Sequence, residues 1–188
     1  MCTDEALFNG LRNGEQDCLV EMVARFHAPL FKYLYRVTGN QQTAEDLVQE
    51  AFIRVIKFQG ETPVSFKAWA YTIARNLARD YFRSATYRQE ASEKMDGEVR
   101  LTGSTISTVE LAALEADERV EVSRALQRLP NDQREVLVLR FYHDLRLEEI
   151  AEITSSPLGT VKSRLYHALK KLKGFLESKE GSVHERAK

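Results

Sequence analysis

Apolar residues recur along most of the chain three or four positions apart, which is the spacing of an α-helix. One such series runs from Gln16 to Val37, includes Pro29, and stops before Gly39 and Asn40. Glycine and asparagine favour the left-handed backbone that ends a helix, and an internal proline removes one helical hydrogen bond. The pattern therefore predicts a helix over 16–37 with a bend near the proline.

Two more helices are predicted in the first half of the chain. The run Thr43-Ala44-Glu45-Asp46 resembles a capping box, in which a hydroxyl and a carboxylate accept free N–H groups of the first turn. A helix is expected over 44–57, and a Gly-Glu-Thr-Pro segment separates it from another helix over 65–83. Alternating patterns typical of strands extend over only a few residues, so the prediction is an all-α fold.

The chain changes character between its two halves. Residues 89–117 contain seven acidic and two basic side chains, a net charge of −5, in a polar segment with two glycines. Such a segment buries too little apolar surface to fold alone, which predicts a flexible acidic linker. The predicted organisation is a first helical domain over residues 1–86, a linker over 87–119, a second helical domain over 120–178 and a tail over 179–188.

The second domain is predicted to contain four helices. Its first two are divided at Leu129-Pro130, the third covers 147–153, and the fourth runs from about 158 to 176. The last two fit a helix-turn-helix, because the small Ala151 lets two helices cross closely. Val161, Leu165 and Leu169 are expected to form the inner face of the fourth helix.

The outer face of that fourth helix is strongly basic. Between positions 162 and 173 there are five cations and no acid: Lys162, Arg164, Lys170, Lys171 and Lys173. A basic amphipathic helix can be an ordinary solvated surface, but the small residue, the turn and the apolar spacing together favour DNA binding. The net charge of −1 does not oppose this, because the cations are concentrated locally.

The first domain contains a second basic segment and one acidic helix. In residues 69–83 aromatic side chains alternate with Arg75, Arg79 and Arg83, a pattern suited to unpaired DNA, although the aromatics can equally be core residues. Trp69 in particular is expected to lie in the core. The helix over 44–57 combines acidic and apolar outer positions, which suits either a protein partner or solvent.

Several classes of protein are disfavoured by the composition. The apolar runs are shorter than the ~18–20 residues that cross a bilayer, and the acidic N-terminus lacks the layout of a signal peptide, so a cytoplasmic location is expected. The two cysteines and four histidines lack metal-ligand spacing, and no phosphate loop or catalytic motif occurs. We expect no enzyme activity, no cofactor and no metal.

Four motifs together resemble the sigma-70 family of RNA polymerase sigma factors, in its extracytoplasmic-function (ECF) group. They are the run over 43–52, the run Phe66-Lys67-Ala68-Trp69 with 73–80, the segment 129–137, and the helix-turn-helix with Gly159-Thr160-Val161-Lys162-Ser163-Arg164-Leu165. Each is loose alone, but their order and spacing match across about residues 10–85 and 120–177.

The resemblance implies a role for each surface. Asp46, Gln49, Glu50 and Ile53 would bind core RNA polymerase. The loop over 59–65, with Lys67, Arg75, Asn76, Arg79 and Arg83, would hold the melted −10 element of a promoter. Lys162, Ser163, Arg164, Tyr166, His167 and Lys170 would bind the duplex −35 element. An anti-sigma factor is the expected inhibitory partner, and direct membrane insertion is not expected.

Two positions depart from the family pattern. Asp144 and Arg146 stand where many relatives have glycine and serine before the first helix of the helix-turn-helix. Aspartate tolerates a left-handed backbone, whereas Arg146 gives up a side-chain cap worth ~1 kcal/mol.

Two other functions are compatible with part of the pattern. A helix-turn-helix regulator with a helical sensing domain explains the second domain but leaves the acidic helix and the arginine–aromatic segment unexplained. A helical anti-sigma or adaptor protein would have no use for a basic recognition helix.

Overall fold

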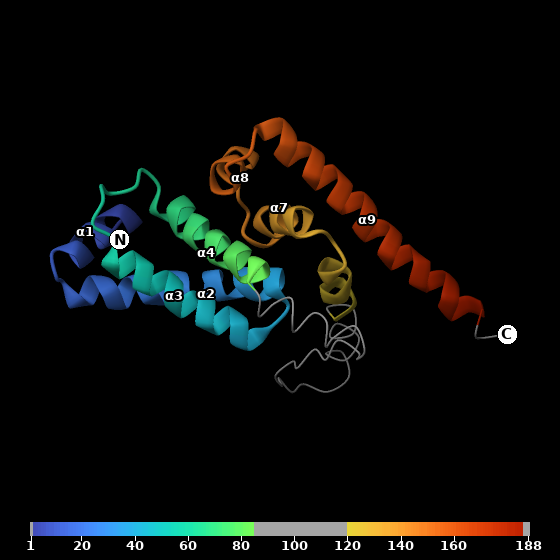
Figure 1. Ribbon diagram of the computed structural model, residues 1–188, viewed down its shortest axis with the longest axis horizontal. Coiled ribbons are helices and arrows are strands. Elements are labelled where there is room, and N and C mark those ends of the chain that lie inside the picture. The colour runs from blue at the N-terminus through green and yellow to red at the C-terminus, as the bar shows by residue number, and fades with distance from the viewer. Residues whose placement is uncertain (1, 85–119, 186–188) are drawn as a thin grey trace.

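The computed structural model describes residues 2–84 and 120–185, with side chains as far as residue 177, and over these residues all regular structure is helical. The first unit contains four helices: α1 (Asp4–Arg12), α2 (Gln16–Thr38), α3 (Gln41–Lys57) and α4 (Phe66–Arg83). The second contains a helical segment over 120–127, then α7 (Asn131–Tyr142), α8 (Leu147–Thr154) and α9 (Leu158–Glu185) (Figure 1).

This arrangement confirms the predicted all-α fold with two helical units and a four-helix second unit. The predicted linker over 87–119 lies outside the described residues. The last helix is longer than predicted, because α9 continues to Glu185 and so includes most of the segment expected as a tail. Figure 1 shows α9 as the long red helix that projects beyond the rest of the molecule.

The junction of α2 and α3 differs in detail from the prediction. α2 continues through Pro29 and ends at Gly39, whose φ of 73° is the left-handed conformation expected of a C-terminal glycine. This reversal leaves Asn40 extended, and its side chain accepts the Thr43 N–H at 2.9 Å. α3 therefore begins at Gln41 with Asn40 as its cap, and the predicted capping box at residues 43–46 is wrong.

The core of the first unit is rich in aromatic residues where α1, α3 and α4 meet. Phe8 of α1 is fully buried, with ring centroids 5.4 Å from both Phe66 and Trp69 and 6.3 Å from Phe58. Ser65 caps α4 by accepting the Ala68 N–H at 3.2 Å, so α4 begins where predicted. Trp69 packs against this cluster, which supports its interpretation as a core residue.

α7 is buried along several faces, not one. The four consecutive residues Val136, Leu137, Val138 and Leu139 are all buried. Leu137 packs in a small cluster inside the second unit, while the other three belong to the large core cluster that includes the first unit. A helix enclosed by neighbours on opposite sides needs apolar residues all round, which explains why its pattern lacks a clear polar face.

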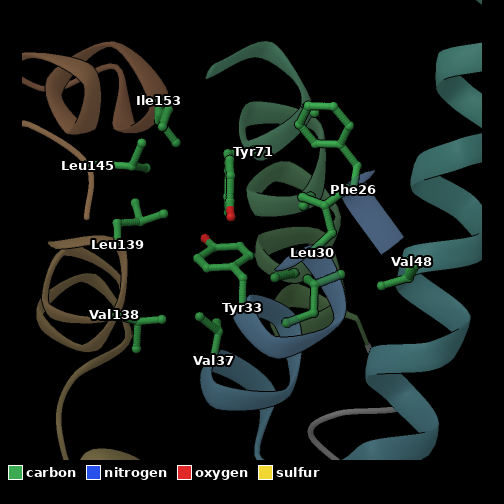
Figure 2. Packing of buried hydrophobic residues seen from close by; sticks show 14 of the residues in the cluster. Phe26, Leu30, Tyr33, Val37, Val48, Tyr71, Val138, Leu139, Leu145 and Ile153 are labelled. Carbon is green, nitrogen blue, oxygen red and sulfur yellow. The ribbon is translucent and has the colours of Figure 1, made fainter. Parts of the chain in front are cut away.

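The two units pack directly against each other. α7 contacts α2, and α8 contacts α4. Figure 2 shows Tyr33 and Tyr71 of the first unit facing Val138, Leu139, Leu145 and Ile153 of the second. The sequence predicted two units but did not predict this shared core.

Candidate polymerase and nucleic-acid interfaces

α8 and α9 form the predicted helix-turn-helix. Ser155 ends α8 in the left-handed conformation at φ 47°, and this turn directs the chain into α9 at Leu158. Ile150 and Val161 are fully buried where the two helices meet. The predicted inner face is wrong at one position: Leu169 is 42% exposed, and the adjacent Ala168 is fully buried in its place. A period of 3.6 residues brings position 168, seven after Val161, back to the inner face.

The outer face of α9 presents five of the six residues predicted to contact DNA. Lys162, Ser163, Tyr166, His167 and Lys170 are all exposed. Arg164 instead lies toward the protein: its Nε is 3.1 Å from Asp132 Oδ2, and its guanidinium donates to Ser156 Oγ at 3.0 Å. In this conformation Arg164 fixes the start of α9 to the start of α7, so it helps to position α9 and does not lie on its outer face.

The two departures before α8 have little structural effect. Asp144 adopts φ 50°, so aspartate does occupy the left-handed position. Arg146 is the N-cap and its side chain provides no cap acceptor. Glu149 compensates in part, because its carboxylate accepts the Arg146 backbone N–H at 2.7 Å.

The predicted polymerase-binding residues form one face of α3. Asp46, Gln49, Glu50 and Ile53 are spaced by three or four residues and lie on the outer side of the helix, with Ile53 42% exposed. Glu50 pairs with Arg54 at 3.0 Å on this surface. Ile56, 48% exposed, lies one turn beyond and extends the apolar part of the face.

The second unit covers one of the α4 residues predicted to bind the −10 element and leaves the others accessible. Lys67, Arg79 and Arg83 are exposed and Asn76 is half-buried. Arg75 is largely covered, with 14% of its side chain exposed, and its Nε lies 2.9 Å from Glu135 Oε1 of α7. The structure therefore places four of these five residues on the accessible part of α4 and removes Arg75 from it.

Glu135 is the centre of a buried polar cluster between the units. Besides the Arg75 contact, Glu135 Oε1 accepts the Tyr33 hydroxyl at 3.1 Å. Burial raises the pKa of the Glu135 carboxyl, and the charge of Arg75 and the Tyr33 hydroxyl oppose that effect. Burial also raises the pKa of Tyr33, which keeps its hydroxyl protonated as the donor. Sequence patterns gave no signal for this cluster, because its two sides are 102 residues apart.

A second polar contact joins α4 to the turn after α7. The Tyr71 hydroxyl is 2.7 Å from His143 Nδ1, and the two rings meet edge to face at 5.2 Å. Burial raises the pKa of Tyr71. Burial, followed by the nearby Arg36 and Lys67, lowers the pKa of His143 to about 4. At neutral pH the Tyr71 hydroxyl therefore meets a neutral imidazole, and the tautomer of His143 sets which of the two groups donates.

This geometry predicts a pH-dependent stability contribution from His143. The folded protein keeps the ring neutral down to about pH 4, while the unfolded chain protonates it below about pH 6.5. The contribution of His143 is therefore present above about pH 6.5 and is lost as the pH falls toward 4. Urea unfolding of the wild type and His143→Gln should show a free-energy difference that shrinks between pH 7 and pH 5. A difference that stays constant would contradict the shifted pKa.

Side chains of the second unit also cap the C-terminus of α2. The last carbonyl groups of a helix have no partner within it and carry partial negative charge. Gln127 Nε2 donates to Arg36 O at 2.8 Å, and the buried guanidinium of Arg134 donates to Val37 O. The same guanidinium donates to Gln127 O at 3.1 Å and Leu129 O at 3.0 Å. Arg134 thus ties the helix end to the loop before α7.

Over the described ranges, 2–84 and 120–185, no group of three or more potential metal ligands occurs. Among the same residues, no helix is long and apolar enough to cross a membrane.

Family comparisons agree with the two units. A model of Sigma-70 region 2 matches residues 22–88, and a model of Sigma-70, region 4 matches residues 119–172. The ECF RNA polymerase sigma factor SigW of Bacillus subtilis is 31% identical over 174 residues, which cover 87% of this chain and 91% of that protein. The ECF RNA polymerase sigma-E factor of Escherichia coli is 31% identical, with 88% and 90% covered.

A third relative is longer. The ECF RNA polymerase sigma factor BldN of Streptomyces coelicolor is 31% identical over 169 residues, and the chain spans 62% of its length. Two solved structures resemble the fold. The sigma factor RpoE in complex with the anti-sigma factor NepR from Bartonella quintana superposes with a TM-score of 0.62 at 25% identity. The superposition covers 85% of this chain and 96% of that one. CnrH in complex with the cytosolic domain of CnrY shares the fold, with a TM-score of 0.69 at 22% identity, covering 93% and 97%.

The helix-turn-helix, the four-helix first unit and these matches define a promoter-specificity subunit of RNA polymerase. The chain belongs to the sigma-70 family and, within it, to the ECF group.

Proposed function

We propose that the three surfaces divide the work of an ECF sigma factor. The α3 face of Asp46, Gln49, Glu50 and Ile53 binds core RNA polymerase. The exposed part of α4, with the loop over 59–65, holds the melted −10 element. The outer face of α9 binds the duplex −35 element. The observation that best supports this division is that the acidic and basic faces lie on separate helices and point to solvent.

The supporting chemistry differs between the two DNA surfaces. Cations at the exposed start of α9 suit phosphates and base edges of a duplex. Exposed cations beside half-buried aromatic residues on α4 suit unstacked bases and their backbone. We infer domain boundaries at residues 1–86 and 120–178, because the two family matches fall almost within them.

The proposal includes a regulatory partner, a cellular location and the absence of catalysis. A sigma factor with the same fold and 25% identity was solved with an anti-sigma factor, which supports an anti-sigma partner for this chain. The protein is proposed to act in the cytoplasm, where polymerase and promoter meet, and to have no enzymatic activity of its own.

Run-off transcription tests the proposal. The purified chain added to core polymerase should start transcripts from a subset of a promoter library, while core alone should not. A helix-turn-helix regulator would instead bind specific duplex DNA without polymerase. Specific duplex binding with no gain of transcription would overturn the proposal in favour of such a regulator.

Glu50→Arg should weaken binding to core polymerase about tenfold or more, because it reverses one charge in the centre of the α3 face. Glu21→Arg is a matched control: Glu21 pairs with Arg25 at i,i+4 on α2 in the same way that Glu50 pairs with Arg54. Fluorescence titration with core measures both variants. Equal affinity of the two would remove α3 from the polymerase interface.

A further inference from the structure

We propose that a pocket between α1 and the end of α3 holds one unpaired nucleotide of the promoter strand, in addition to the nucleotides held by α4. The identity of the strand rests on the proposed function, whereas the pocket is a property of the chain alone. α1 lies outside both family matches, and none of the predicted DNA contacts falls on it. The pocket therefore gives a role to a helix that has none so far.

The lining of the pocket has the chemistry of a base-binding site. Its volume is about 480 Å³, which is the size of pocket that holds a small organic group. Each primary amide in the lining offers a donor and an acceptor side by side, as the edge of an unpaired base does. The lining combines three amides, one guanidinium and two apolar side chains: Asn9, Asn13, Gln59, Arg12, Ile56 and Phe58.

Phe58 gives the pocket a fixed aromatic wall. Its half-buried ring lies 4.7 Å from the Trp69 ring and 6.3 Å from the Phe8 ring, measured between centroids. The loop after α3 passes directly over the same ring, because a Cβ atom at Gly60 would lie 2.4 Å from Phe58 Cζ. Unpaired bases stack on aromatic side chains whatever their sequence. A ring that is held in place on several sides suits such stacking.

α1 is tied to the loop over 59–65, so the pocket is formed before any strand binds. The Thr62 hydroxyl donates to Asn9 Oδ1 at 2.5 Å, and the Glu5 carboxylate accepts the Phe66 N–H at 3.1 Å. Figure 1 shows α1 beside this loop, which joins α3 to α4. A binding site that needs no ordering of its own walls loses less free energy when a ligand enters.

The charge at the pocket favours a nucleotide over a neutral ligand. Arg12 is an exposed cation in the last turn of α1, and Lys57 is an exposed cation at the end of α3. Within the part of the chain that the structure describes, no acidic side chain forms an ion pair with Arg12. Its guanidinium therefore keeps its donors for a phosphate.

Strands with abasic sites test the base contact. Holoenzyme made from core polymerase and the full-length chain binds a promoter strand that lacks one base at a time, and fluorescence anisotropy measures each affinity. Asn13→Ala should weaken binding of the intact strand about fivefold. The same variant should have no effect on the strand that is abasic at one particular position, because the base that Asn13 meets is already absent.

Two other variants show whether the effect belongs to the pocket. Gln16→Ala removes an exposed amide three residues further on that does not line the pocket, so its effect should disappear at no abasic position. The effect of Asn76→Ala on α4 should disappear at a different position from that of Asn13→Ala. If Asn13 and Asn76 are coupled to the same base, the assignment of a further nucleotide to the pocket is wrong.

Arg12→Gln tests the phosphate contact. The slope of log affinity against log salt concentration should fall in magnitude by about 0.7, which is the change expected for one phosphate of a single strand. Asn13→Ala should leave the slope unchanged, because it removes no charge. An unchanged slope for Arg12→Gln would show that no phosphate lies at the pocket and would overturn the proposal.

The remaining outcomes separate the pocket from the proposed function. Helical circular dichroism should be unchanged in all variants. Strand binding by the wild type with no position coupled to Asn13 would refute the pocket and leave the proposed function standing, whereas a wild-type holoenzyme that binds no strand would overturn both. Free deoxynucleoside monophosphates should not compete with the strand. Competition that removes the Asn13 effect would assign the pocket to a free nucleotide and refute the strand as its ligand.

Discussion

Replacement of Arg134 by methionine is expected to lower the free energy of unfolding by about 3–4 kcal/mol. The side chain is buried and donates to Val37 O, Gln127 O and Leu129 O, so methionine fills similar space but leaves these carbonyl groups without their donor. A buried polar group that loses its partner costs about 1–3 kcal/mol. Urea denaturation followed by circular dichroism measures the change.

Arg128→Met provides the matched control. Arg128 is exposed and its guanidinium lies 4.3 Å from the centre of the Phe175 ring, so its loss should cost at most about 1 kcal/mol. If Arg134→Met is no more destabilising than Arg128→Met, the carbonyl groups at the end of α2 are satisfied by something other than Arg134, and its role as a tie between the units is wrong.

Phe8→Ala should lower the free energy of unfolding of the first unit by about 3–5 kcal/mol. The substitution removes the ring at the centre of a cluster with Phe58, Phe66 and Trp69. The same helix holds the start of α4, where the Glu5 carboxylate accepts the Phe66 N–H at 3.1 Å. Promoter opening at the −10 element should therefore decline more than binding of a −35 duplex. Thermal unfolding and permanganate footprinting measure the two effects.

Phe141→Ala is the control for this change. Phe141 is 55% exposed, whereas Phe8 is fully buried, so the control should lose little stability. α1 lies outside the residues matched by the family models, which begin at residue 22. Equal losses for the two variants would mean that α1 is dispensable for the core of the first unit.

Local chemistry explains why many features were predictable. The end of α2 at Gly39, the start of α4 at Ser65 and the division before α7 at Pro130 depend on residues that act within one helical turn. The exposed face of α3 and most of that of α9 follow from a 3.6-residue period. At the α3 cap and at Leu169 the error was a shift of one or a few positions along a helix that was itself expected, whereas α1 was not predicted at all.

The sequence by itself therefore determined every described helix except α1, the two units, and most of the exposed positions on α3, α4 and α9, because each depends on neighbours a few residues apart. Only the tertiary structure decided that α7 is enclosed by both units, that Arg75 faces Glu135, and that Tyr71 meets His143. Those contacts join residues 60 to 72 positions apart along the chain. Their free energy comes from burial and from pairing of polar groups across an interface, and periodicity within one helix contains no information about either.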